Sequence, residues 1–177
     1  MTEGPGQDLI GKIRIVPDFP KKGIEFFDIT TLWNDAEGFK KLNDLFYENY
    51  KDKGITKVVG IEARGFLTAS VMAYRLGCGV SLVRKPGKLP YETISESYEL
   101  EYGTNEIHLH NDAVHKGDVV LLMDDLLATG GTMAATVKLV EKLGASIAGI
   151  AFIVELDFLK GREKLGGHEI LSLIRTS

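Results

Sequence analysis

The chain has 177 residues, 44% of them hydrophobic and 26% charged, with a formal net charge of −4, a composition typical of an ordinary globular domain. The lack of a long basic run argues against nucleic acid as a partner, and no apolar run reaches the roughly 20 residues of a membrane-spanning helix. The single cysteine excludes an intrachain disulfide, and we expect a cytoplasmic protein. The length predicts one domain over 9–177, and the polar first residues predict a flexible tail over 1–8.

Helices and strands alternate in the hydrophobic pattern that follows an irregular, proline-containing N-terminal stretch. Apolar residues recur at helical spacing from Phe39 to Tyr50, and the short apolar runs that follow are rich in β-branched residues, as in buried strands. The predicted elements are a helix over 35–52, a strand over 57–61, a helix over 66–76 and a strand over 80–83.

Residues 85–97 have no clean period and contain Pro86, Gly87 and Pro90, which predicts a long loop. Long loops in compact domains are often lids over functional sites. Segments 98–102 and 106–110 alternate in character and are expected to form a hairpin.

The second half of the chain carries the strongest strand signal, a nearly continuous apolar run over 118–124. A helix is predicted over 132–143, ended by Gly144, and a further strand over 147–154. Alternating strands and helices predict an α/β fold with a parallel sheet. Ligands of such sheets bind beyond the carboxyl ends of the strands, which directs attention to residues 62–65 and 124–132.

Residues 124–132 read Asp-Asp-Leu-Leu-Ala-Thr-Gly-Gly-Thr and lie between a predicted strand and a predicted helix. Gly130 and Gly131 allow the backbone to curl into a nest of N–H groups, and the helix that follows adds its free N–H groups and positive dipole end. Thr129 and Thr132 add hydroxyl donors, so the segment predicts a phosphate site.

Two adjacent carboxylates, Asp124 and Asp125, stand at the start of this segment, and the Gly-Lys-Ser/Thr of nucleotide-hydrolysing P-loops is missing. Carboxylates suit sugar hydroxyls, which donate hydrogen bonds to them, and a Mg²⁺ ion held mainly by substrate oxygens and water. The segment therefore predicts a site for a phosphate, a ribose and a metal ion.

The run Val120–Thr132 resembles the binding motif for phosphoribosyl pyrophosphate (PRPP) of type I phosphoribosyltransferases, in the Leu-Leu-Ala-Thr form of the adenine-specific branch. Further segments resemble that branch in the expected order from about residue 14 to residue 165. They are 17–29, 62–66, 84–90, 100–103 and 159–165.

The resemblance implies a type I phosphoribosyltransferase fold: a central, mostly parallel sheet flanked by helices over about 35–177, with a small N-terminal hood over a base pocket, mainly 9–34. It implies the reaction of adenine with PRPP to give AMP and diphosphate in purine salvage, with Mg²⁺ as cofactor. It also implies a homodimer, in which basic residues matching Arg84 and Lys85 reach the neighbouring subunit's site.

The resemblance also assigns roles to single residues. Glu101 would be the general acid/base that handles the purine proton, with Asp124 and Asp125 on the ribose. The 5-phosphate would be bound by Ala128, Thr129, Gly130, Gly131 and Thr132. The diphosphate and its lid would involve Ala63, Arg64, Arg84, Lys85, Lys88 and Tyr102, and adenine would meet Glu25, Phe26 and Leu127.

Some points stay open at the level of sequence. Strand alternation places Glu99 and Glu101 on the same side, so spacing alone does not choose between them. Phe27 stands where the family often has arginine, and this leaves the base contacts of the hood unsettled. The alternative functions are transfer to another purine base, a PRPP-sensing regulator on the same fold and a Mg²⁺-dependent nucleotide-binding module.

Overall fold

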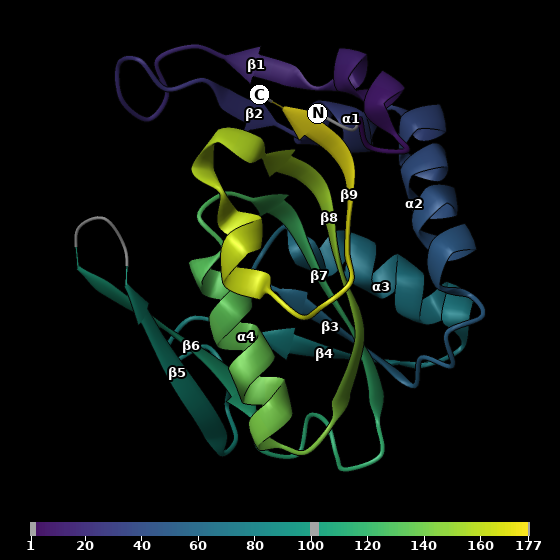
Figure 1. Ribbon diagram of the computed structural model, residues 1–177, viewed down its shortest axis with the longest axis vertical. Helices are drawn as coiled ribbons and strands as arrows, with labels where there is room; N and C mark the ends of the chain where they lie inside the picture. The colour runs from purple at the N-terminus through teal and green to yellow at the C-terminus, as the bar shows by residue number, and fades with distance from the viewer. Residues whose placement is uncertain (1–2, 100–102, 177) are drawn as a thin grey trace.

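The computed structural model describes residues 3–99 and 103–176 and has a five-stranded parallel sheet at its centre (Figure 1). The strand order is β4-β3-β7-β8-β9. The strands are β3 (Lys57–Ile61), β4 (Gly79–Val83), β7 (Val119–Leu127), β8 (Ser146–Leu156) and β9 (Ile170–Thr176). This confirms the predicted α/β class, and the strands predicted over 57–61, 80–83, 118–124 and 147–154 are β3, β4, β7 and β8.

Helices cover both faces of the sheet, as Figure 1 shows. The helices α2 (Ala36–Tyr50) and α3 (Gly65–Leu76) pack on one face, and α4 (Gly131–Lys142) packs on the other. Alternate residues of a strand point to opposite faces. Accordingly Leu121 and Met123 of β7 join the α2–α3 core, whereas Val120 and Leu122 join the α4 core.

The N-terminal segment lies beside the carboxyl ends of the strands (Figure 1). It holds the 3-10 helix η1 (Gln7–Lys12), the antiparallel pair β1 (Arg14–Val16) and β2 (Phe26–Asp28), and α1 (Thr30–Asn34). The backbone N–H of Gly6 donates to Leu173 of β9 at 2.9 Å, and the Gln7 side chain donates to the Arg175 carbonyl at 3.0 Å. These bonds join the residues near Gly6 to β9, and the flexible tail over 1–8 stays a prediction.

An antiparallel hairpin of β5 (Thr93–Glu99) and β6 (Thr104–His110) lies over α4. The hairpin was predicted, but its first strand begins at Thr93, so the end of the loop expected over 85–97 is strand. The side chain of Glu96 on β5 pairs with Lys138 and Lys142 of α4 at 3.1 and 2.7 Å. These ion pairs, with Ile94 and Tyr98 packed against the core on the same side, hold this largely polar strand on the helix.

Two short 3-10 helices, η2 (Asp157–Leu159) and η3 (Gly161–Leu165), connect β8 to β9. In the parts of the chain that the structure describes, no helix combines the length and apolar character needed to cross a membrane.

Candidate active site

The predicted phosphate segment forms a tight turn between β7 and α4. Gly130 is the residue before α4 and has a φ of 77°, a left-handed conformation that side chains rarely adopt. A cavity of about 70 Å³ opens at this turn and is lined by Asp124, residues 126–133 and Phe152. The helix N-terminus and the turn together provide the unpaired N–H groups that an anion requires.

A second backbone segment supports this turn. A Cβ atom added to Gly130 would lie 2.4 Å from the carbonyl oxygen of Gly161, and one added to Gly161 would lie 2.1 Å from the carbonyl oxygen of Ala128. The first residue of η3 therefore touches the phosphate turn backbone to backbone, at a distance that only glycines permit.

The two carboxylates lie at the carboxyl end of β7. Asp125 is 5% exposed, and its backbone N–H donates to Asp124 Oδ1 at 2.9 Å. Burial raises the pKa of Asp124 well above its ordinary value, and the charge of Asp125 raises it further. Burial also raises the pKa of Asp125, but the Arg64 guanidinium, whose Nε lies 2.8 Å from Oδ2, opposes that rise.

Arg64 lies in the turn between β3 and α3, where the Glu62–Ala63 peptide bond is cis. A Cβ atom on Gly65 would lie 2.9 Å from Asp124 Oδ1, so this turn can approach the acidic pair only because residue 65 is glycine. The Arg64 guanidinium also lies over the Phe26 ring, 5.6 Å from its centroid. One side chain thus joins the hood to the acidic pair.

Glu62 lies in the segment 62–65 to which the strand ends directed attention, but no role was predicted for its side chain. Its Oε2 accepts hydrogen bonds from Arg84 Nε at 3.1 Å and from the backbone N–H of Lys85 at 3.0 Å. Burial favours a higher pKa for Glu62, but the hydrogen bond from Lys85 and the Arg84 charge outweigh it and lower the pKa. An ionised Glu62 therefore fixes the start of the loop, and its position directly after a strand end was the available signal.

A cavity of about 710 Å³ brings these groups together. Of the predicted residues, its lining includes Ala63, Arg64, Arg84, Lys85, Asp124, Asp125 and Thr132. Lys88 takes part through its carbonyl oxygen, which accepts a hydrogen bond from Arg84 at 3.0 Å.

A further cavity of about 650 Å³ lies under the hood and is lined by Glu25, Phe27, Thr129, Leu159 and other residues of the hood and of η2. Of the residues predicted to meet the base, Glu25 lines this cavity; Thr129, which was predicted for the 5-phosphate, and Phe27 line it too. Phe26 instead packs under Arg64, and Leu127 is buried in the core on the α4 side of the sheet.

The hairpin closes over the phosphate turn through Tyr98. The Thr132 hydroxyl donates to Tyr98 Oη at 3.0 Å, and a Cβ atom on Gly131 would lie 2.9 Å from the Tyr98 ring. The predicted Glu101 and Tyr102 lie outside the described residues, whereas Glu99 is exposed on β5.

Replacing Arg64 with methionine is expected to move the acidic limb of the pH profile of kcat/KM to higher pH. Without the guanidinium, the largest of the effects that oppose burial at Asp125 is lost and its pKa rises further, so the ionised form is reached only at higher pH. We also expect kcat/KM at neutral pH to fall about 10-fold or more, because a charged hydrogen-bonding group is lost. An unshifted acidic limb would contradict the coupling between Arg64 and Asp125.

Comparison with known proteins agrees with this site. The fold and the phosphate turn beside an acidic pair are those of a phosphoribosyl transferase domain, and the model of that family matches residues 29–166. An adenine phosphoribosyltransferase of Syntrophotalea carbinolica is 53% identical over 169 residues, covering 96% of this chain and 99% of the relative. The chain belongs to the adenine phosphoribosyltransferase family.

Solved structures of the family have the same fold. The crystal structure of adenine phosphoribosyltransferase from Thermoanaerobacter pseudethanolicus is similar with a TM-score of 0.92 and 50% identity, covering 96% of this chain and 98% of that one. The enzyme from Saccharomyces cerevisiae, complexed with an imino-altritol bisphosphate and adenine, has a TM-score of 0.89 and 39% identity, covering 94% and 97%.

Proposed function

We propose that this protein transfers the phosphoribosyl group of PRPP to adenine, giving AMP and diphosphate in purine salvage. One observation carries the proposal: the phosphate turn and the acidic pair lie between the two larger cavities. Thr129 lines the cavity under the hood, whereas Thr132 lines the cationic cavity with the acidic pair. A base on one side, a ribose phosphate in the middle and a diphosphate on the other fit this arrangement, and the yeast relative binds adenine.

In the reaction, the bond from the anomeric carbon to the diphosphate oxygen breaks while the purine nitrogen N9 bonds to that carbon from the opposite face. The 5-phosphate is held by the turn over residues 128–132, and the ribose hydroxyls donate to Asp124 and Asp125. Both carboxylates also stabilise the positive charge that develops on the sugar. Arg64, Lys85 and Lys88 balance the charge of the departing diphosphate, and the lid excludes water from the cationic sugar.

The donors present fit a Mg²⁺ ion bound mainly through substrate. In the part of the chain that the structure describes, no group of three or more His, Cys, Asp or Glu side chains is arranged to hold a metal by itself. The oxygens of Asp124 and Asp125 are the kind of protein donor that Mg²⁺ prefers, although Asp125 Oδ2, which no described hydrogen bond reaches, is paired with Arg64 Nε at 2.8 Å. When bound, Mg²⁺ neutralises charge on the diphosphate.

The proton of the purine is assigned to Glu101, with Tyr102 beside it at the lid. Glu99, the last residue of β5, is the alternative. Base choice is assigned to the hood, where the backbone of Glu25 and Phe26 would bind the edge of adenine. For Leu127 to pack on the adenine ring, its side chain, 1% exposed in this structure, would have to become accessible. A site built around specific hydrogen bonds rejects bases that leave them unmade.

We further propose a homodimer. The exposed apolar side chains of Leu67 and Tyr74 on α3 and of Val80 and Leu82 on the edge strand β4 support it. Exposed apolar groups gathered on adjacent elements are typical of an interface. Arg84 and Lys85 follow β4 directly and would reach the neighbouring subunit's site. The cytoplasmic location stays a prediction.

The test is product formation from PRPP and Mg²⁺ with adenine, hypoxanthine, guanine and xanthine offered separately. We expect AMP from adenine, at a kcat/KM at least about 100-fold above that of the other bases. We also expect loss of turnover when a chelator removes Mg²⁺. Preference for another base would overturn the role of the hood, and PRPP binding without any turnover would favour a regulator.

A further inference from the structure

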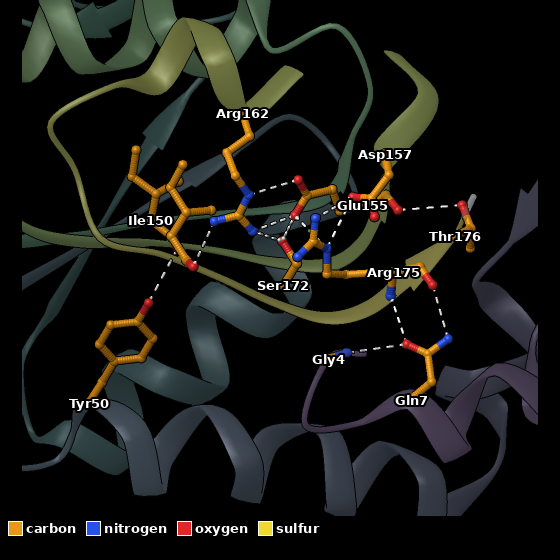
Figure 2. A network of polar contacts seen from close by, with 11 residues as sticks. Gly4, Gln7, Tyr50, Ile150, Glu155, Asp157, Arg162, Ser172, Arg175 and Thr176 are labelled. Carbon is orange, nitrogen blue, oxygen red and sulfur yellow. Dashed lines mark hydrogen bonds and ion pairs between the residues drawn. The ribbon is translucent and has the colours of Figure 1, made fainter. Parts of the chain in front are cut away.

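A network of charged groups lies around the carboxyl end of β8, and its residues Glu155 and Arg162 line neither of the two larger cavities (Figure 2). Glu155 at the end of β8 is 2% exposed. Arg162 of η3 donates to it twice, from Nε to Oε1 at 2.9 Å and from Nη2 to Oε2 at 2.5 Å. The Ser172 hydroxyl of β9 donates to Oε2 at 2.6 Å. This paired fork is the strongest geometry available to an arginine and a carboxylate.

The ion pair closes a ring around the phosphate turn. On one side, Glu155 is the register partner of Leu127, the last residue of β7 before the turn. On the other side, Arg162 follows Gly161, whose backbone touches the turn at Ala128 and Gly130. The Glu155–Arg162 pair is thus the side-chain link between the strand that leads into the turn and the segment that supports it from behind.

The supporting segment needs such a link because it has little stability of its own. η3 contains five residues, and 3-10 helices have poorer hydrogen-bond geometry than α-helices. It is entered through Lys160, whose φ of 52° is unfavourable for a residue with a side chain. A conformation of this kind persists only where its surroundings enforce it. Arg162 supplies that enforcement, since its Nη1 also donates to the Ile170 carbonyl at 3.2 Å.

We propose that Arg162, held by Glu155, is a positioning residue for the 5-phosphate of PRPP. It touches no substrate; it fixes Gly161 against Ala128 and Gly130 and so preserves the curvature of the turn that binds the phosphate. The inference rests on the proposed function, because that function makes this turn the phosphate site. Glu155 and Arg162 line neither of the two larger cavities, whereas Gly161 touches the phosphate turn directly, so loss of the pair is expected to weaken PRPP more than adenine.

The test compares Arg162→Met with the unchanged protein. We expect the KM for PRPP and the dissociation constant of ribose 5-phosphate, measured by calorimetry, to rise about 10-fold, because small displacements of binding groups are costly. The KM for adenine should change less than about 2-fold. Glu155 keeps Ser172 at 2.6 Å and Arg175 Nε at 3.9 Å as neighbours, so its charge is not left without partners and the fold should survive.

Arg75→Met is the matched control. Arg75 forms an ion pair with Asp44 between α3 and α2, far from the turn, and its side chain has a similar exposure, 29% against 37% for Arg162. The Arg75→Met variant should leave the KM for PRPP and the dissociation constant of ribose 5-phosphate unchanged. Arg162→Lys should recover part of the affinity, because one ammonium can pair with Glu155 but cannot make the fork. If Arg162→Met does not fold, Glu155→Gln is measured in its place. The glutamine amide has an NH₂ group where one carboxylate oxygen accepted from Arg162, so the paired hydrogen bonds are lost while the size of the side chain is kept.

The outcomes separate the two proposals. The positioning role would be overturned if Arg162→Met changed the KM for PRPP and the KM for adenine equally, or changed neither. It would also be overturned if Arg75→Met showed the same defect. If the unchanged protein bound ribose 5-phosphate but made no AMP, the proposed function would fail, and the calorimetric comparison would still decide whether Arg162 positions the phosphate turn.

Discussion

Asparagine at both Asp124 and Asp125 is expected to lower kcat about 100-fold or more, because the carboxylates oppose the charge that develops on the sugar in the transition state. The amides keep the size of the side chains and accept hydrogen bonds, so the overall structure should remain. Steady-state turnover with saturating adenine and PRPP measures the effect. Asp52→Asn, at an exposed position after α2, is the control and should retain full activity. Normal turnover in the double variant would refute the role of the pair.

The single variant Asp124→Asn should also make the ligand-free protein more stable at neutral pH. The folded protein raises the pKa of Asp124, so it binds that proton more tightly than the unfolded chain does. Stability from this group is therefore present below the ordinary value of 3.8 and is lost as the pH rises through the raised pKa. Asparagine removes the loss. Thermal melting would detect it, since 1 kcal/mol changes Tm by about 2–4 °C in a chain of this size.

Gly130→Ala is expected to raise the KM for PRPP more than about 10-fold and to destabilise the fold by about 1–3 kcal/mol. The new Cβ would lie 2.4 Å from the carbonyl oxygen of Gly161, in a backbone conformation with a φ of 77°. The Gly161 carbonyl is part of the backbone and cannot rotate away as a side chain can, so the turn or η3 must move. Kinetics with varied PRPP and chemical denaturation measure the two effects.

Gly54→Ala separates the contact from the backbone strain. Gly54 has a φ of 65°, and a Cβ atom there would meet nothing within 4 Å. It should lose only the part of the stability that is due to strain, and keep the KM for PRPP of the unchanged protein. If both alanine variants behaved alike, the contact with Gly161 would have no part in phosphate binding.

The sequence predicted the elements with strong periodic signals and missed those held by specific contacts. β3 and β7 are buried on both faces, so their apolar runs identified them. The first strand of the hairpin was predicted as loop up to Ser97, because residues 85–97 have no clean period. Glu96 of this strand is held by ion pairs with Lys138 and Lys142 of α4. No local pattern marks such pairs.

The candidate site shows the same division. The phosphate turn could be predicted because its glycines, hydroxyls and carboxylates are consecutive in the chain. Glu62 and the Glu155–Arg162 pair could not, because their roles depend on partners brought close by the fold. Arg162 reaches Glu155 only after a reversal through the left-handed Lys160, which is not a residue favoured in that conformation.

The Phe26 ring beneath Arg64 bears on how this enzyme family can change its choice of base. Successive side chains of a strand point to opposite sides, so on β2 the ring of Phe26 meets the guanidinium, while Phe27 lines the cavity under the hood. A substitution at Phe26 would disturb the residue that steadies Asp125, and with it the chemistry. A substitution at Phe27 would change the wall of that cavity and its packing on the core, without touching Arg64. If the base binds under the hood as proposed, we expect new base preferences to arise at Phe27 more readily than at Phe26.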